Sequence, residues 1–267
     1  MSLVYLITGL PRIERGALPS LSRAEFVRRC RDELRGPERD EFELLVQIES
    51  VEETVRLALR AQLDAADDES VAGAVVLDRQ DGVPLERLPE WVLRPAPQHV
   101  LLRRHYHEVT QAANTEFLRR WANFRVDIGE VITAKLCRVD GMSRDAFLVQ
   151  MQGSFDASAP LIMRNWEDPT LGLGQRFWWL DRVLRALEDD DLLAMSRELD
   201  AVLWEKVEEL STHETFSVET LLETYLKLRI LEREASWDAE RGRAMLDRIL
   251  AMSAEATAGS TAGEGTA

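Results

Sequence analysis

Apolar residues recur at intervals of three or four along most of this chain, a spacing that is typical of amphipathic α-helices. The longest stripe lies in LLRRHYHEVTQAANTEFLRRWANFRVDIGEVITAKLCRVDG, which begins at residue 101. Its apolar members share one continuous helical face. We therefore predict a single long helix here, ended by Asp140 and Gly141. The stripe consists of Val109, Ala113, Phe117, Trp121, Phe124, Ile128 and Val131.

The segment LSRAEF contains the signals of a helix start. Ser22 can cap the first turn, Glu25 can reach back to the cap, and Leu21 can pack against Phe26 as a hydrophobic staple. A helix over 23–35 follows from these signals. Cys30 lies on its apolar face, which favours a packing role over a nucleophilic one.

A second periodic run covers 38–64, after Gly36 and Pro37. Its apolar positions keep helical spacing throughout, and Ser50 with Glu53 has the pattern of a cap that restarts the helix in mid-run. Residues 1–19 are interpreted as a short buried strand or helical turn followed by a loop.

Further helices are predicted toward the C-terminal end. Ser143 caps one that continues to about Gln152, and a loop with Pro160, Asn165 and Pro169 follows it. Acidic residues before Leu192 favour the positive end of the next helix dipole. The predicted helices after the loop cover 175–188, the stripe from Leu192 to Val207, a segment capped by Ser217, and 238–252.

The segment FSVETLLETYLKLRILERE, residues 216–234, is apolar over more than half of its helical circumference. Glu219, Glu223 and Lys227 form a charged seam at a spacing of four. A helix this apolar is expected to lie between other helices.

The fold class predicted from these patterns is an all-α, multi-lobed helical bundle with at most one short strand pair. AGAVVL at 72–77 is the strand candidate. Four prolines between Gly82 and Gln98 mark a boundary. We predict an N-terminal helical lobe at 1–98, a C-terminal lobe at 99–253 that packs on it as one body, and a disordered tail at 254–267, which has no large apolar residue.

The charge of the chain limits its partners. The formal net charge is −15, which disfavours nucleic acid and anionic membrane surfaces and favours a basic or mixed-charge partner, although the acidity can also serve solubility alone. No apolar run approaches the ~20 residues of a membrane span, and no basic leader precedes Pro11. Cys30 and Cys137 form no CxxC pair, so a cytoplasmic location without zinc or disulfides is expected.

The search for reactive groups predicts no catalytic, cofactor or metal site. His105 and His107 are two positions apart and therefore point in different directions on a helix. The sequence LGLGQRF at 171–177 is interpreted as a turn rather than a dinucleotide fingerprint. Adjacent Trp178 and Trp179 also diverge, and one of them can face a neighbouring lobe or a partner, although a core position is the commoner one for tryptophan.

The N-terminal sequence carries a family resemblance. VYLITGLP, followed by LSRAEFVRRCRDEL, resembles the start of an uncharacterised bacterial family with a Tyr-Leu-x-x-x-Leu-Pro signature, whose members are encoded with V/A-type ATPase subunits. The resemblance covers most of the chain up to about residue 250.

Two internal segments are also similar to the C-type subunit of the V/A-type ATPase, which corresponds to the d-type subunit in eukaryotes. The matching residues are Trp121, Val126, Asp127 and Lys135 in WANFRVDIGEVITAK, and Phe216, Tyr225, Arg229 and Glu232 in FSVETLLETYLKLRILERE. The chain departs from the pattern of the C-type subunit at Glu130, where Asn is common, and at Ala235 and Trp237, where an Asn-x-Arg element is usual.

The resemblance implies an all-helical, funnel-shaped, non-catalytic subunit that couples the central rotor stalk of a bacterial V/A-type ATPase to its membrane ring. Such a protein binds stalk and ring subunits and lies at the inner face of the cell membrane without spanning it. Two alternatives stay open: an assembly or regulatory factor of the same complex, and a helical enzyme whose site draws on scattered groups such as His107 and Glu108.

Overall fold

The computed structural model describes residues 3–17, 19–66, 98–150, 158–188, 191–211 and 215–236. Within these ranges the secondary structure is helical and contains no strand, which confirms the all-α prediction. None of the helices in these ranges combines the length and the apolarity that crossing a membrane requires. The helices are α1 (Leu3–Thr8), α2 (Arg23–Glu33), α3 (Gly36–Ala66), α4 (Gln98–Ala112), α5 (Glu116–Val139), α6 (Arg144–Gln150), α7 (Ser158–Arg164), α8 (Leu180–Ala186), α9 (Leu192–Leu210) and α10 (Val218–Ser236).

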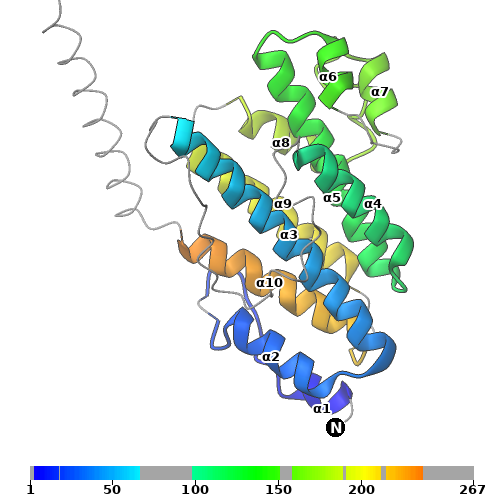
Figure 1. Cartoon of the computed structure of the whole chain (residues 1–267), viewed down its shortest axis with the longest axis vertical. Helices are drawn as coiled ribbons and strands as arrows, with labels where there is room; N and C mark the ends of the chain where they lie inside the picture. Colours follow the sequence, from blue (N-terminus) through cyan, green and yellow to red (C-terminus); the bar gives the residue numbers. More distant parts are fainter. Residues whose placement is uncertain are drawn as a thin grey trace, which may run out of the picture.

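The helices form an elongated bundle (Figure 1). Helices α1 and α2 lie at one end of the long axis, and α6 and α7 lie at the other. Between these ends, α10 packs against α2, α3, α5 and α9, while α5 packs against α4 and α6 to α9. A single apolar core of buried residues runs through helices from both halves of the sequence.

Helix α10 is the central helix that its apolar sequence predicts. Leu221, Leu222, Leu226 and Leu228 are buried, and the helix has neighbours on several sides. Phe42 of α3 stands edge-on to Tyr225 at 6.0 Å between ring centroids. The expectation that this helix lies between others is confirmed.

The prediction of one long helix from residue 101 to Asp140 is wrong. The chain turns at 113–115, so that α4 and α5 lie side by side as two helices. Thr115 caps α5, because its side chain accepts a hydrogen bond from the Leu118 N–H at 3.2 Å. Ala113 and Phe117 keep a spacing of four across the turn, so the apolar pattern alone does not reveal it.

A buried carboxylate stabilises this turn. Glu41 of α3 accepts hydrogen bonds from the backbone N–H groups of Asn114 at 2.8 Å and Thr115 at 2.9 Å. The Thr115 hydroxyl also donates to Glu41, at 2.5 Å. The backbone N–H groups between the end of α4 and the start of α5 thereby find a hydrogen-bond acceptor in a distant part of the sequence.

The N-terminal helices follow the predictions with one exception. Ser22 caps α2 by accepting a hydrogen bond from the Glu25 N–H, and Cys30 is buried in the core. The N-terminal segment is helical at α1 rather than a strand. The prediction that the helix restarts at Ser50 is wrong, because α3 is continuous. The Ser50 hydroxyl instead donates to the Val46 carbonyl at 2.7 Å within this helix.

Two corrections concern the segment between α6 and α9. The predicted loop around Pro160 contains α7, because proline at the third position of a helix gives up an N–H that has no intrahelical partner there. Helix α8 begins at Leu180 instead of 175, after a series of turns in which Leu171 and Gly172 have φ of 55° and 69°. The interpretation of LGLGQRF as a turn is confirmed.

The tryptophan pair diverges as predicted. Trp179 is 2% exposed and Trp178 is 47% exposed. The strand candidate at 72–77, the helix at 238–252 and the tail at 254–267 lie outside the described residues. So do the four prolines of the boundary, and the division into lobes stays a prediction.

Candidate functional site

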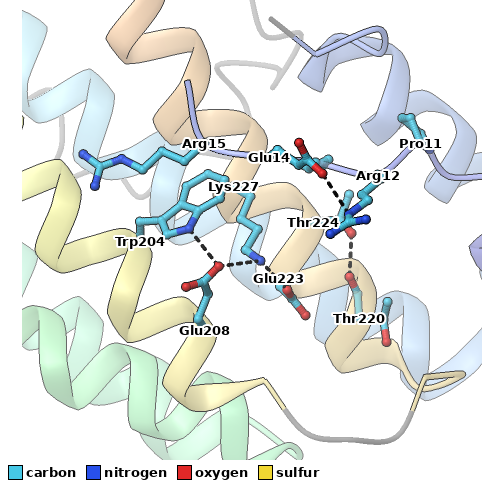
Figure 2. A pocket seen from close by; sticks show the side chains of 11 residues that line it. Pro11, Arg12, Glu14, Arg15, Trp204, Glu208, Thr220, Glu223, Thr224 and Lys227 are labelled. Atoms are coloured by element: carbon cyan, nitrogen blue, oxygen red, sulfur yellow. Dashed lines mark hydrogen bonds and ion pairs between the residues drawn. The ribbon is translucent and has the colours of Figure 1, made fainter. Parts of the chain in front are cut away.

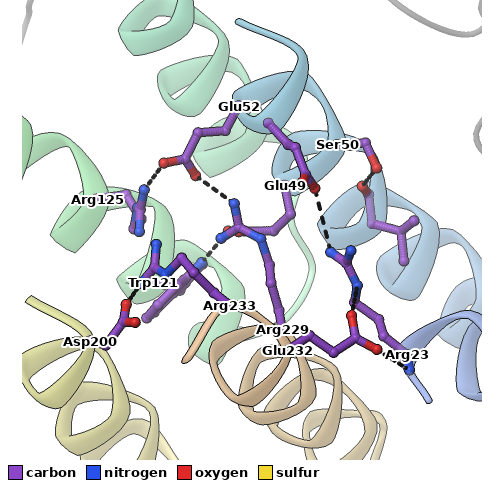
Figure 3. A network of polar contacts seen from close by, with 12 residues as sticks. Arg23, Glu49, Ser50, Glu52, Trp121, Arg125, Asp200, Arg229, Glu232 and Arg233 are labelled. Atoms are coloured by element: carbon purple, nitrogen blue, oxygen red, sulfur yellow. Dashed lines mark hydrogen bonds and ion pairs between the residues drawn. The ribbon is translucent and has the colours of Figure 1, made fainter. Parts of the chain in front are cut away.

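Charged side chains from several helices meet inside the bundle (Figure 3). Helix α3 contributes Glu49 and Glu52, α5 contributes Arg125, and α10 contributes Arg229 and Arg233. Helix α9 adds Asp200, and α4 and α5 add the polar side chains of Tyr106 and Trp121. We call this group the buried ionic network. It lies where α3, α5, α9 and α10 approach one another.

Glu49 occupies the most enclosed position in the network. Its side chain is 0% exposed, and it forms an ion pair with Arg229. The indole N–H of Trp121 donates to its Oε1 at 3.0 Å. A carboxylate taken out of water in this way needs both partners, since the desolvation of an isolated charge is very costly.

Glu52 lies one turn further along α3, between two guanidinium groups. It pairs with Arg125 and lies 3.5 Å from Arg229, and the Tyr106 hydroxyl donates to it at 2.8 Å. Burial alone would raise the pKa of Glu52, but the charges of Arg125 and Arg229 and the Tyr106 hydrogen bond lower it to about 2. Burial raises the pKa of Tyr106 well above its ordinary value. Both groups therefore keep one protonation state at neutral pH.

Two contacts link α10 to the neighbouring helices α2 and α9. The backbone N–H of Arg23, the first residue of α2, donates to Glu232 of α10 at 2.8 Å, and the Arg23 guanidinium lies 3.0 Å from the same carboxylate. Arg233 of α10 pairs with Asp200 of α9, whose side chain is 0% exposed. These contacts tie α10 to the helices on either side of it.

The network is electrically balanced at its centre. Glu49, Glu52 and Asp200 face an equal number of guanidinium groups, from Arg125, Arg229 and Arg233. A balanced buried network of this kind contributes little net stability relative to a well-packed apolar core, but it penalises any arrangement of the helices that separates the partners. Its physical effect is to fix how the helices sit against one another.

A cavity of about 420 Å³ borders the network. Glu52, Tyr106, Arg125, Asp200 and Arg233 are among the polar and charged residues that line it. The apolar lining residues are Leu102, Ile128, Gly129, Ile132, Leu199 and Leu203.

A second surface feature is the groove between residues 11–15, α9 and α10 (Figure 2). The Lys227 ammonium lies 2.7 Å from Glu223 and 3.5 Å from Glu208 there, and it stands 5.1 Å above the Trp204 ring. Trp204 also donates to Glu208 at 2.9 Å. Within the charged seam that the sequence indicates, Glu223 and Lys227 form an ion pair, and Lys227 also links α10 to Glu208 of α9.

The residues that sequence reasoning considered for chemistry are dispersed. Glu108 is exposed and pairs with Arg104 at 3.2 Å, and neither it nor His107 lines the cavity. Burial lowers the pKa of His105, against the opposing effect of Glu108. Cys30 and Cys137 are buried free thiols, and burial raises the pKa of each. Among the described residues, no three His, Cys, Asp or Glu side chains are grouped to hold a metal ion.

Two of the eight residues that carry the sequence resemblance, Trp121 and Arg229, meet in this network. Trp121 of the first segment and Arg229 of the second both bind Glu49. Glu232 of the second segment binds Arg23. Asp127 accepts a hydrogen bond from Ser158, and Lys135 pairs with Glu188 at 2.6 Å, both away from the network.

A family described as a protein of unknown function (DUF2764) matches residues 97–255, which is more than half of the chain. The chain belongs to this family. The prediction of an uncharacterised family is thereby confirmed, on the part of the chain that begins just before α4. No curated protein and no solved structure matches the chain significantly.

In this member of the family, sequence reasoning missed the buried ionic network, although one signal was available. Arg229 stands in a helix that is apolar over most of its circumference, between Leu228 and Ile230. A charged residue in such a helix cannot reach water easily and therefore requires a buried partner. The partners Glu49 and Glu52 lie far away in the sequence, and only the fold identifies them.

The network predicts a specific dependence of stability on pH. The pKa of Glu52 is lowered from 4.5 to about 2. The stability that the ionised Glu52 carboxylate contributes is therefore complete above pH 4.5 and is lost as the pH falls toward 2. We expect Glu52→Gln to be less stable than the wild type at pH 7, with a smaller difference at pH 3. Urea unfolding of both proteins at the two pH values measures this, and an unchanged difference would contradict it.

A substitution at Gly129 in α5 is expected to stabilise the protein. A Cβ built on it meets no heavy atom within 4 Å, and glycine inside a helix costs about 0.5–1 kcal/mol relative to alanine. Gly129→Ala is therefore expected to raise the free energy of unfolding by about 0.5–1 kcal/mol. Thermal and urea unfolding test this, and a loss of stability would show that the open space is needed.

Proposed function

We propose that this protein is a non-catalytic subunit of a bacterial V/A-type ATPase, which couples the central rotor stalk to the membrane ring. The observation that carries the proposal is the buried ionic network, together with its position. It joins helices from the beginning, middle and end of the described chain at the centre of an elongated bundle. This is a suitable construction for a body that transmits force.

Torque transmission requires that helices keep their relative positions under load. Apolar packing resists separation but permits sliding, because it is non-directional. The ion pairs of Glu49 with Arg229 and of Asp200 with Arg233 are directional, and sliding would leave a buried charge without its partner. The network therefore adds resistance to the displacement that a coupling protein must withstand.

The sequence resemblance supports the same assignment from a separate direction. The two segments that are similar to the C-type subunit provide Trp121 and Arg229, and both side chains bind Glu49. This meeting of two of the eight resemblance residues at one buried point supports a shared helical body. The elongated shape offers two well-separated ends for two partners.

The charge of the chain fits partners with basic or mixed-charge surfaces. A net charge of −15 attracts such surfaces over about a Debye length, which is roughly 8–10 Å at physiological salt. Association with the stalk or ring is therefore expected to weaken as salt is raised.

The proposal is tested by purifying the tagged protein from its native cells under low and moderate salt. We expect the stalk and ring subunits of the ATPase to be recovered with it, and their absence at both salt concentrations would contradict the proposal. Stoichiometry separates the two roles that the resemblance allows. A stable component is present in a fixed ratio in the mature enzyme, whereas an assembly or regulatory factor is found only in incomplete or transient complexes.

A further inference from the structure

An apolar stripe on α5 continues past the cavity beside the buried ionic network. Ile128 and Ile132 line the cavity, and Leu136 and Val139 follow at a spacing of three or four, on the same face of the helix. We call these four residues the α5 stripe. Exposure rises along it, from 5% at Ile128 to 47% at Leu136 and 64% at Val139. The described residues therefore leave its far half largely uncovered.

Helix α9 borders the same cavity. Ser196, Leu199 and Leu203 line it, and Leu193 lies one turn before Ser196. Leu203 is 4% exposed, Leu199 is partly buried and Leu193 is 41% exposed. The apolar side chains on this side of α9 are therefore less covered toward the start of the helix.

Helices α5 and α9 run antiparallel, so the uncovered parts of both lie at the same end of the pair. Arg120, near the start of α5, lies 3.5 Å from Glu209, near the end of α9. Lys135, near the end of α5, lies 2.6 Å from Glu188, which precedes α9. An exposed apolar face that is continuous over two neighbouring helices is typical of a surface that binds another chain segment.

One segment of this chain has the length and the pattern to cover that face. Residues 238–252 lie outside the described residues, and their sequence predicts an amphipathic helix with Met245, Leu246, Ile249 and Met252 on one side. A helix over 238–252 is about 22 Å long, and α5 extends over about 21 Å from Arg125, which lines the cavity, to Val139.

The described part of α10 ends close to the cavity. Ser236 is its last residue, and Arg233, three positions earlier, lines the cavity and pairs with Asp200 of α9. A tether this short gives residues 238–252 a high effective concentration at the α5 stripe. The longer internal segment 67–97 joins α3 to α4, but its sequence has a strand candidate followed by four prolines, and neither provides a long amphipathic helix.

We propose that residues 238–252 bind as a helix along α5 and α9, with their apolar side against the uncovered half of the α5 stripe and against Leu193 and Leu199. The occupant of this face is thus a segment of the same chain. The inference is independent of the proposed ATPase role, since it rests on the exposed face, on the position of Ser236 and on the sequence that follows it.

A nitroxide spin label in the full chain tests this contact. Asp247→Cys places the label opposite the apolar side of the predicted helix, and the native Cys30 and Cys137 are buried. Methyl NMR signals of Leu136 and Leu193 are expected to lose intensity relative to the protein with a reduced, diamagnetic label. Ile7 of α1, at the other end of the bundle, should keep its intensity.

Two double variants of the spin-labelled protein show whether the apolar side makes the contact. Met245→Asp with Ile249→Asp places charge on that side and should restore the intensities of Leu136 and Leu193. Ala244→Asp with Ala251→Asp adds the same charge away from it and should leave the loss of intensity in place. Circular dichroism checks that the helical body is retained in both.

A mixed sample separates this contact from association of two copies. Isotope-labelled protein without the nitroxide is combined with nitroxide-labelled protein without the isotope, and full methyl intensity is expected. An equal loss of intensity in the mixed sample overturns the proposal and assigns the face to a second copy. Full intensity of Leu136 and Leu193 in the spin-labelled chain also overturns it and leaves the face to residues 67–97 or to a partner protein. A loss that persists with Met245→Asp and Ile249→Asp overturns the assigned contact side.

Discussion

Arg229→Met is expected to lower the free energy of unfolding by about 3–5 kcal/mol, the usual cost of removing one partner from a buried ion pair. Glu49 would keep its charge in a fully buried position, with only the Trp121 indole to compensate it. Glu52 would also lose one of its two cations. Urea unfolding followed by circular dichroism at pH 7 measures the effect.

Two further variants make this result specific to the network. Arg28→Met removes an arginine whose side chain is 66% exposed and whose partner Asp32 lies on the same helix, and a change within about 0.5 kcal/mol is expected. Glu49→Met combined with Arg229→Met removes both charges and should recover much of the lost stability. A single variant that loses less than about 1 kcal/mol would show that the pair is not truly buried.

Glu41→Ala is expected to destabilise the protein by about 2–4 kcal/mol, because two backbone N–H groups at the turn between α4 and α5 would lose their acceptor. The carboxylate also holds the Thr115 hydroxyl, which caps α5. We expect faster hydrogen exchange at Asn114, Thr115 and Leu118, in addition to the lower free energy of unfolding.

Glu41→Gln and Glu38→Ala are the matched variants for this turn. Glutamine keeps an acceptor oxygen but loses the charge, so an intermediate loss is expected. Glu38 is an exposed residue in the first turn of the same helix, and its removal should change stability by no more than about 1 kcal/mol. Equal effects of Glu41→Ala and Glu38→Ala would refute the assigned role of Glu41.

Local signals in the sequence were sufficient for most of the helices. Helix α2 has a complete cap at Ser22, and α9 and α10 have long apolar stripes that begin just after Asp191 and Ser217. In these helices the local sequence pattern agrees with the tertiary packing, so the pattern alone is enough to predict the helix.

Elements that depend on distant residues could not be predicted in the same way. The turn between α4 and α5 is stabilised by Glu41, more than seventy positions earlier in the chain. The role of Glu49 likewise depends on Arg229, which no local pattern connects to it. A carboxylate in an amphipathic helix looks the same in sequence whether it faces water or a buried arginine.

Coupling between ATP hydrolysis and ion transport tests the central claim most directly. Membrane vesicles from cells that lack this protein should hydrolyse ATP at the V/A-type ATPase but fail to pump ions, and adding the purified protein should restore pumping. The unstable Arg229→Met variant should restore it less well than Arg28→Met. An unchanged number of ions pumped per ATP in vesicles without the protein would contradict the account.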